Sequence, residues 1–422
     1  MKFGGGNPNR IHKFIMCKRL RPYFFIGALL FVFGFDYYVL SFERVRNPEL
    51  PKEGVAARLM ESVKTLTQEK WEGRKPKTDG NREAAAWIED KFRSCGLRSF
   101  PSLRGYRQAL TGGLGDNVVA YKSAQTKSDR WIVVGAHFDH VGRSGFFNRV
   151  HWGADDNASS VAILLEAACS VDFLKDSNII FVAYNTEEPP YFQGVDMGSY
   201  VFVENLPAEI GGHSKIAASI SMDLMGGAHW RPLMGALFVV GSWTGEGLAK
   251  IVTEIEQKDL SVVQLGYHAI ERLPWGSRSP VSDYVPYLDR RVPSILLSVG
   301  RTPRYHDPQD TYETLDYLGM ERRTRWLLSF LSRLDTFKGA FTMEDAVDLE
   351  LERQSLKPFV DKAARWSTRV PASSFFTMRN FRRDLAALEQ PQNDSDKRIL
   401  IEHIVGRFEC TMMNLPICFL ID

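Results

Sequence analysis

The sequence has 422 residues, of which 44% are hydrophobic and 25% are charged, as in an ordinary globular protein. This is enough material for one large domain with additional segments. The formal net charge at pH 7 is +2, which excludes a strong electrostatic argument for nucleic-acid binding, so we expect no nucleic-acid partner.

The N-terminus has the pattern of a membrane anchor. Basic residues between Lys13 and Arg21 precede PYFFIGALLFVFGF, fourteen residues without a charge, and apolar residues resume after Asp36 up to Phe42. A basic flank before an apolar run is typical of a secretory signal or a signal anchor. No small-x-small cleavage site follows, so we expect an uncleaved anchor with its basic side in the cytoplasm.

The topology that this pattern predicts places the rest of the chain on the periplasmic or extracellular side of the membrane. Secretion after signal cleavage is the alternative. A buried first helix of a soluble protein also stays open, because the apolar run is near the short limit for a span and Asp36 is costly at depth.

Between about Pro51 and Phe337, predicted strands alternate with predicted helices. The strands are continuous apolar runs at residues 117–121, 131–139, 178–185, 216–225, 236–241 and 294–300. The helices are predicted at residues 55–66, 82–95, 159–170, 197–203, 245–257 and 317–337. Continuous apolar strands are expected in a sheet that helices cover on both faces. The pattern predicts an α/β fold with a mostly parallel central sheet sandwiched by helices.

Beyond residue 337 the pattern becomes helical and carries no chemical motif. Helices are predicted at residues 343–366 and 375–390, followed by the polar stretch PQNDSDKR. We therefore divide the chain into a basic tail with a hydrophobic signal anchor (1–50), a catalytic domain (51–337) and a helical C-terminal extension (338–422). The extension is expected to pack onto the domain or onto a partner.

The five cysteines predict neither a zinc site built from thiolates nor a disulfide framework. They show no CxxC motif and no paired spacing. Cys410 and Cys418 are near enough in sequence to pair in an oxidising compartment, but their spacing is weak support for it.

The stretch GADDNASS (153–160) places Asp155 and Asp156 directly before the apolar run VAILLEAA. Asp, Asn and Ser side chains accept hydrogen bonds from the free N–H groups of a first helical turn, so the stretch can cap a helix. A carboxylate also has two oxygens and can bridge two cations. The stretch alone leaves both functions open.

Histidine and acidic residues gather at the predicted strand ends, where open α/β sheets collect functional groups. They are His137, Asp139, Glu187, Glu188, Asp223 and, after the last strand, His306. Imidazole and carboxylate ligands suit zinc, and also manganese or cobalt. Two cations could share one carboxylate of the Asp155–Asp156 pair, each with one histidine and one further carboxylate. Asn157 and Ser159 would then help to cap the following helix.

In their order, the motifs HxD, GADDNAS, EE, D and YH resemble those of the zinc-dependent aminopeptidase family, the co-catalytic two-zinc exopeptidases. That family also contains glutamate carboxypeptidases and glutaminyl cyclases. The segment SDYVPYLDRRVPSILL (282–297) is similar to the family's SDHxPF…GIPxxxL segment. The resemblance covers about residues 55–337 and implies a zinc-exopeptidase-like fold.

Carried over residue by residue, the resemblance implies two zinc ions. One would be held by His137, Asp156 and Asp223, and the other by Asp156, Glu188 and His306. It also implies that Glu187 is the general base, that Asp139 hydrogen-bonds His137 and fixes its tautomer, and that Tyr305 donates to the oxyanion.

Other polar residues have structural expectations. Asp155 is expected to cap a helix or to support a ligand, Asp139 has turn capping as its alternative, and Asp283 either orients a loop or joins the site. The remaining histidines are expected at the surface or in loops: His140, His151, His213, His229, His268 and His403. Of these, His140 and His151 are candidates for the rim of the site.

The predicted function is hydrolysis of N-terminal residues of peptides by a two-zinc aminopeptidase, with a peptide substrate and membrane attachment. The alternatives are a glutaminyl cyclase-like acyl transferase and a non-catalytic binding module, and the full ligand set argues against both. Departures from the family, PPYFQGVDMGS (189–199) after the glutamates and SDY in place of SDH, concern substrate preference. The sequence indicates no oligomeric state.

Overall fold

The computed structural model describes residues 48–227, 235–255, 259–271, 279–339, 341–343, 347–366, 383–390 and 392–412. The predicted membrane anchor lies outside these residues. Within the described part of the chain, no helix has the length and apolar character needed to cross a membrane.

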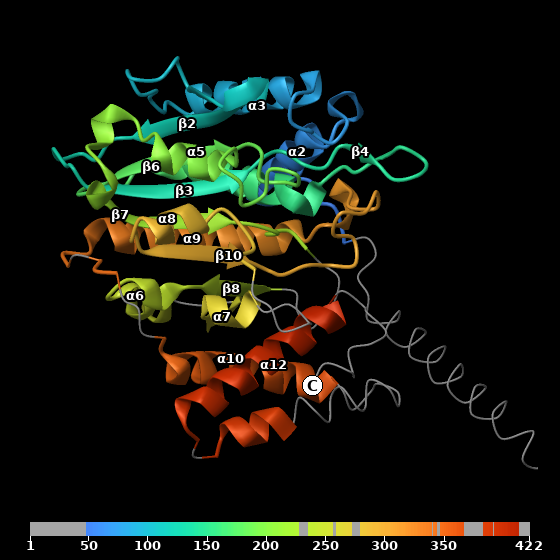
Figure 1. Ribbon diagram of the computed structural model, residues 1–422, viewed down its shortest axis with the longest axis vertical. Coiled ribbons are helices and arrows are strands. Elements are labelled where there is room, and N and C mark those ends of the chain that lie inside the picture. The colour runs from blue at the N-terminus through green and yellow to red at the C-terminus, as the bar shows by residue number, and fades with distance from the viewer. Residues whose placement is uncertain are drawn as a thin grey trace, which may run out of the picture.

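An eight-stranded sheet with the order β1-β2-β6-β3-β7-β10-β8-β9 forms the centre of the molecule (Figure 1). The strands are β1 Arg107–Ala109, β2 Asp116–Lys122, β3 Trp131–His137, β6 Asn178–Tyr184, β7 Ile216–Met222, β8 Ala236–Val240, β9 Ser261–Leu265 and β10 Ser294–Ser298. The central strands β6, β3, β7 and β10 are parallel neighbours. The pairs β1–β2, β2–β6 and β10–β8 are antiparallel, so the sheet is mixed and the predicted parallel arrangement holds at its centre.

Helices cover both faces of the sheet, which confirms the predicted α/β architecture. Side chains of β3 alternate between the faces, as strand geometry requires: Ile132 and Val134 pack on one side and Val133 on the other. The first face is covered by α2 Gly54–Leu66, α3 Asp79–Ser94, α4 Ser160–Ser170, α6 Leu248–Glu254 and α9 Tyr317–Thr336. The second face is covered by α5 Gly198–Glu204 and α8 Val285–Asp289.

The described part of the C-terminal extension packs beside the β8–β9 end of the sheet (Figure 1). It contains α10 Leu349–Trp366, a helical segment at 383–388 and α12 Asp394–Met412. The backbone amide of Gln264 in β9 donates a 2.5 Å hydrogen bond to Oγ of Ser355 in α10. The extension therefore covers an edge strand, a position that otherwise exposes unpaired backbone groups.

A disulfide joins Cys95, at the end of α3, to Cys169 in α4, with 4.8 Å between their Cα atoms. The cysteine spacing, which indicated no disulfide framework, therefore missed this bond. The pairing could not be found from the sequence because the two cysteines are separated by 74 positions and only packing brings the two helices together. The proposed pairing of Cys410 cannot be compared, since Cys418 lies outside the described residues.

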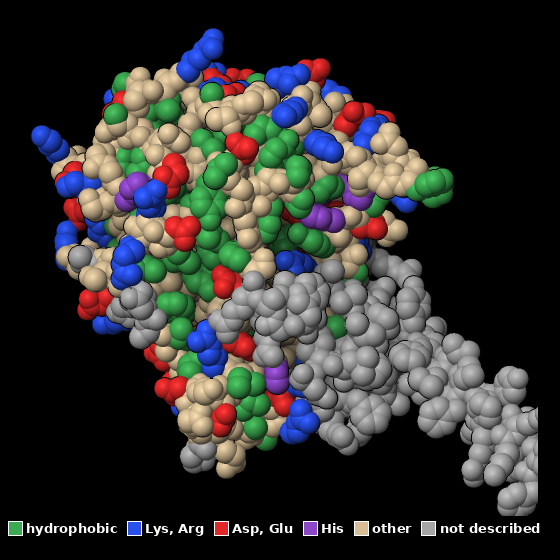
Figure 2. Space-filling view, in the orientation of Figure 1, with side chains coloured by type: hydrophobic (Ala, Val, Ile, Leu, Met, Phe, Trp, Pro, Cys, Tyr) green, Lys and Arg blue, Asp and Glu red, His purple; other side chains and the backbone are tan. Residues whose placement is uncertain are grey.

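A short hairpin of β4 Arg143–Ser144 and β5 Arg149–Val150 projects from the molecule. Its tip carries Phe146 and Phe147, which are 96% and 81% exposed, and hydrophobic side chains stand out at this point in Figure 2. In the same view, histidine side chains reach the surface near the base of the hairpin.

Candidate metal centre

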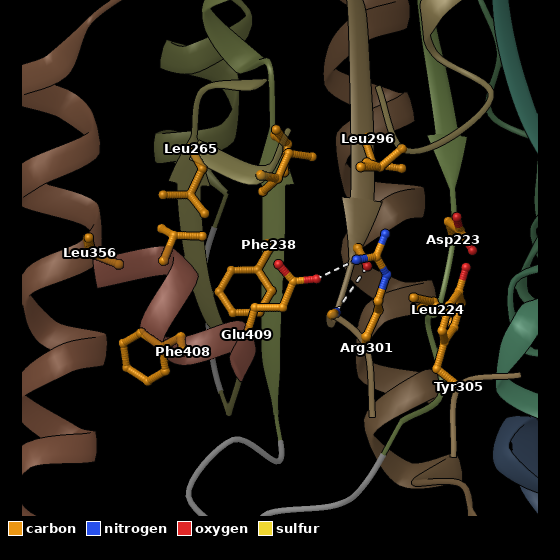
Figure 3. Close-up of a pocket in the computed structure, with 16 residues that line it drawn as sticks. Asp223, Leu224, Phe238, Leu265, Leu296, Arg301, Tyr305, Leu356, Phe408 and Glu409 are labelled. Carbon is orange, nitrogen blue, oxygen red and sulfur yellow. Dashed lines mark hydrogen bonds and ion pairs between the residues drawn. The ribbon is translucent and has the colours of Figure 1, made fainter. Parts of the chain in front are cut away.

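The predicted site residues converge where the central parallel strands end. β3 ends at His137, Asp223 directly follows β7, and the glutamate pair follows β6. His306 lies in the loop between β10 and α9. Carboxyl ends of parallel strands share one edge of the sheet, so the loops bring these side chains together. Figure 3 shows Asp223 at the end of its strand beside Tyr305.

The two carboxylate oxygens of Asp156 lie in two different clusters of ligand-type atoms. Its Oδ1 is 3.5 Å from Nε2 of His137, and that nitrogen is 3.6 Å from Oδ1 of Asp223. Its Oδ2 is 3.0 Å from Nε2 of His306, and that nitrogen is 3.1 Å from Oε2 of Glu188. Ligand atoms about 2 Å from a tetrahedral zinc ion lie roughly 3.3 Å apart. Both clusters therefore have the spacing of a metal site.

Several atoms that point into these clusters have no other partner. Within the described residues, Nε2 of His137, Oδ2 of Asp156, Oδ1 of Asp223 and Nε2 of His306 are buried and make no hydrogen bond. Leaving a buried polar atom unpaired costs about 1–3 kcal/mol. Bound cations would satisfy all four atoms, so the residues fit two divalent metal ions.

The charges of the site also favour cations. Burial raises the pKa of the Glu187 carboxyl well above its usual value; the charge of Glu188 adds to this, and His137 offsets it only in part. Burial lowers the pKa of His306, but the close carboxylates of Asp156 and Glu188 outweigh it and raise the pKa to about 10. Without a metal the crowded groups retain protons, whereas a divalent cation favours their deprotonated forms.

His140 belongs to the site, contrary to the expectation that it lies at the surface or at the rim. It is fully buried, and its Nδ1 lies 2.8 Å from Oε1 of Glu188 and 3.8 Å from Oδ2 of Asp156. Burial lowers the pKa of its imidazole to about 3, so the ring is neutral and able to bind a metal or to orient Glu188. Its position three residues after His137, on the loop leaving β3, was the signal available in the sequence.

Asp139 holds the glutamate pair more directly than it holds His137. Its two carboxylate oxygens accept hydrogen bonds from the backbone amides of Glu187 and Glu188, at 3.1 and 3.2 Å. Nδ1 of His137 lies 3.3 Å from the backbone carbonyl of Asp139 and 3.7 Å from its carboxylate. The carboxylate therefore fixes the backbone from which the proposed base and one proposed ligand extend.

The small polar residues of GADDNASS bind the chain after β7, which corrects their expected role as caps of α4. The side chain of Asn157 donates to the carbonyl of Met222 and accepts from the amide of Leu224, on either side of Asp223. Oγ of Ser159 accepts from the amide of Met225. Asp155 supports the same segment, since its carboxylate accepts from the amide of Gly226 at 2.8 Å.

Two buried residues that the sequence did not identify support the loops of the site. The carboxylate of Asp310 accepts hydrogen bonds from the backbone amides of Asp155 and Asp156. The Arg74 guanidinium donates to four backbone carbonyls, among them those of Phe138 and Gly153. Both charged side chains bond to backbone groups of loops that are distant in sequence. Such contacts leave no local sequence pattern, so neither residue could be identified before the loop conformations were known.

Tyr305 stands beside the clusters with its ring stacked on His306, at 4.0 Å between ring centroids. Burial and the charges of Asp156 and Glu188 raise the pKa of its phenol well above the usual value, so the hydroxyl is a hydrogen-bond donor. Tyr305 lines a pocket together with Glu187 and the ligand carboxylates. Pro189 and Phe192 also line this pocket. They belong to the loop after the glutamates, which departs from the family pattern.

The remaining expectations concern Asp283 and three of the histidines. Asp283 is buried near the site, and burial raises its pKa to about 7. His151 lies in a loop, as expected, although it is buried and its Nε2 lies 2.8 Å from Oγ of Ser144. His268 was expected at the surface or in a loop but is buried in a helix against the C-terminal extension. His229 lies outside the described residues.

Comparison with known proteins places this geometry in context. The sequence pattern described as Peptidase family M28 matches residues 117–331, about half of the chain. The uncharacterized protein YfbL of Escherichia coli (strain K12) is 26% identical over 334 residues, which are 74% of this chain and 99% of that protein.

Solved structures of aminopeptidases have a similar fold. A zinc aminopeptidase from Bacillus subtilis, BSAP, matches with a TM-score of 0.51 and 15% identity, over 71% of this chain and 100% of that one. The LapA aminopeptidase of Legionella pneumophila matches with a TM-score of 0.50 and 18% identity, over 68% of this chain and 73% of that one. At these identities the likeness shows a shared fold.

Proposed function

Because the chain belongs to peptidase family M28, we propose that it is a two-zinc aminopeptidase that removes N-terminal residues from peptides. The observation that carries the proposal is the position of Asp156, whose two oxygens face two separate sets of ligands. His137 and Asp223 would complete one metal site, and Glu188 and His306 the other. When bound, the ions would supply Lewis-acid chemistry by making a water more acidic and polarising the scissile carbonyl.

The protein's own residues provide the proton transfers. Glu187 faces the pocket and is not needed as a ligand in either cluster, so it takes the proton of the attacking water and gives it to the leaving amine. The Tyr305 phenol donates a hydrogen bond to the oxygen that gains negative charge as the carbonyl carbon becomes tetrahedral. Asp139 keeps Glu187 in place through the backbone.

The charges around the pocket support an N-terminal rather than a C-terminal specificity. Carboxylates line the pocket, and an α-ammonium group fits such a field better than a carboxylate does. Arg301 also lines the pocket, but its guanidinium is paired with Glu409 at 2.7 Å. That pairing leaves it poorly suited to bind the C-terminal carboxylate of a peptide.

We also propose that the catalytic domain is exported and attached to a membrane through residues 1–50, with secretion after cleavage as the alternative. The disulfide between Cys95 and Cys169 supports export, because disulfides persist mainly in oxidising compartments. In cells without an outer membrane, we expect protease added to intact cells to digest the catalytic domain. In cells with an outer membrane, we expect digestion once that membrane has been selectively permeabilised. Protection even after selective permeabilisation of an outer membrane would contradict export.

The activity is tested with aminoacyl 4-nitroanilides, the same compounds acetylated on the α-amine, and dipeptides. We expect hydrolysis of the free aminoacyl compounds, loss of this hydrolysis on acetylation, and loss on chelation that added zinc reverses. Equal hydrolysis of acetylated compounds, or activity that a chelator does not change, would contradict the proposed function.

A further inference from the structure

An apolar pocket adjoins the candidate metal centre. It shares Asp223, Arg301 and Tyr305 with the pocket over the proposed ligands, so the two spaces lie side by side. On the sheet side its walls are Leu224, Phe238, Leu265 and Leu296, and Figure 3 shows these side chains around one space. Its empty space of about 820 Å³ includes open solvent at its mouth, so the enclosed part that a side chain can fill is smaller.

The C-terminal extension forms the opposite wall of this pocket. Leu356 of α10 and Val405 and Phe408 of α12 line it. The Phe408 ring packs against that of Phe359, at 4.7 Å between centroids, so it is held by its neighbours. These residues lie beyond residues 117–331, the part of the chain that matches the peptidase family. The pocket is thus a joint product of the catalytic domain and a segment outside the family match.

An ion pair stands where the apolar pocket meets the metal centre. Arg301, after β10, and Glu409, on α12, approach to 2.7 Å, and a dashed line joins them in Figure 3. The pair holds α12 at the entrance of the apolar pocket, and the positive charge of Arg301 neutralises the negative charge of Glu409. A charged substrate side chain placed deeper would lose its hydration without gaining a partner. A Leu or Phe side chain would instead gain free energy from the burial of its apolar surface.

We propose that the C-terminal extension completes a binding pocket for a large apolar side chain on the N-terminal residue of the substrate. This inference rests on the proposed function, because the carbonyl of that residue must lie at the metal centre. Tyr305 lines both the pocket over the metal centre and the apolar pocket. When the carbonyl of the N-terminal residue lies at the metal centre, the side chain of that residue enters the apolar pocket. α10 and α12 then determine specificity, with Val405 and Phe408 as the selecting residues.

The first test compares alanyl, leucyl and phenylalanyl 4-nitroanilides with the full-length protein. We expect kcat/KM for the leucyl or phenylalanyl compound to exceed that for the alanyl compound by about tenfold or more. Val405→Phe fills the pocket and should reduce the phenylalanyl-to-alanyl ratio about tenfold. Phe408→Ala enlarges it and should shift the phenylalanyl-to-leucyl ratio toward phenylalanyl. Ile399→Ala changes an aliphatic residue on the same helix that is 43% exposed, and it should leave both ratios unchanged.

A binding measurement separates this inference from the proposed activity. Calorimetry with Glu187→Gln protein should show tighter binding of leucine and phenylalanine than of alanine, and Val405→Phe in that background should remove the difference. Such binding without any hydrolysis by the wild type would overturn the proposed function and keep the pocket assignment. Equal affinities for alanine and leucine, or ratios that neither folded pocket variant changes, would overturn the pocket assignment.

Discussion

Glu187 and Glu188 are adjacent in sequence, yet their carboxylates face different groups. Glu188 is enclosed by His140 and His306, at 2.8 and 3.1 Å. Glu187 lines the pocket, and its carboxylate comes no nearer than 3.7 Å to His137. Both backbone amides bind Asp139, so one carboxylate fixes the divergence of the two side chains.

We predict different consequences for removing the charge of each glutamate. Glu187→Gln should retain both metals and reduce kcat by about 10²–10⁴-fold, because an amide cannot accept the water's proton at neutral pH. Glu188→Gln should lose one metal, since it removes a negative ligand. Metal analysis and steady-state kinetics on both variants check this. If Glu187→Gln loses a metal and Glu188→Gln loses only rate, the two roles are exchanged.

Three of the proposed ligands, His137, Glu188 and Asp223, could be predicted from sequence because each lies at or just after the end of a recognisable apolar strand, whereas Asp156 and His306 lie in loops and were assigned from the order of the motifs. His137, Asp223 and the glutamates keep a fixed distance from strands whose order places their ends together. His140, Asp310 and Arg74 could not be predicted in the same way. Their partners are loop backbone groups or side chains from distant segments, and those distances depend on loop conformations that local patterns do not determine.

At the level of elements, a buried cluster of ionisable residues joins the extension to a helix of the catalytic domain. Nε2 of His268, in α7 Tyr267–Ile270, lies 3.2 Å from Glu352 of α10, and its Nδ1 lies 3.3 Å from Glu402 of α12. The histidine and Glu352 are almost fully buried. The cluster therefore links three elements that are distant in sequence, in addition to the apolar packing around it.

Removing Glu352 should destabilise the protein much more than removing a nearby exposed glutamate. Glu352→Ala breaks a buried pair and should reduce the free energy of unfolding by about 3 kcal/mol or more. Glu350→Ala, on the same helix, breaks an exposed pair with Arg353 and should cost about 1 kcal/mol or less. Urea unfolding of both full-length variants measures the difference, and equal effects would show that the buried cluster does not stabilise the extension.

The strands and helices themselves were largely predictable, with instructive exceptions. The six predicted strands form, since each is a long apolar run that lies in the sheet. β9 was missed because only five residues form it and the run SVVQL contains polar side chains. α12 begins inside the stretch interpreted as polar, because its buried face becomes visible only with the extension against β8 and β9.

At the scale of the whole molecule, the disulfide between Cys95 and Cys169 ties α3 to α4 on one face of the sheet. A crosslink over such a long loop restricts the unfolded chain. Reduction should therefore decrease the free energy of unfolding by about 2–5 kcal/mol. The double variant Cys95→Ser with Cys169→Ser should show the same loss and no further response to reductant. Unfolding curves that superimpose with and without reductant would contradict this.

The most direct test of the account is the number of zinc ions bound per chain. Mass spectrometry of the native protein after zinc addition and removal of excess metal should show two ions in the wild type. His306→Ala should retain one, and Asp156→Ala should retain none in stoichiometric amount, because Asp156 has an oxygen in each cluster. A folded wild-type chain that binds one ion or none, or Asp156→Ala protein that still binds two, would contradict a centre built around this carboxylate.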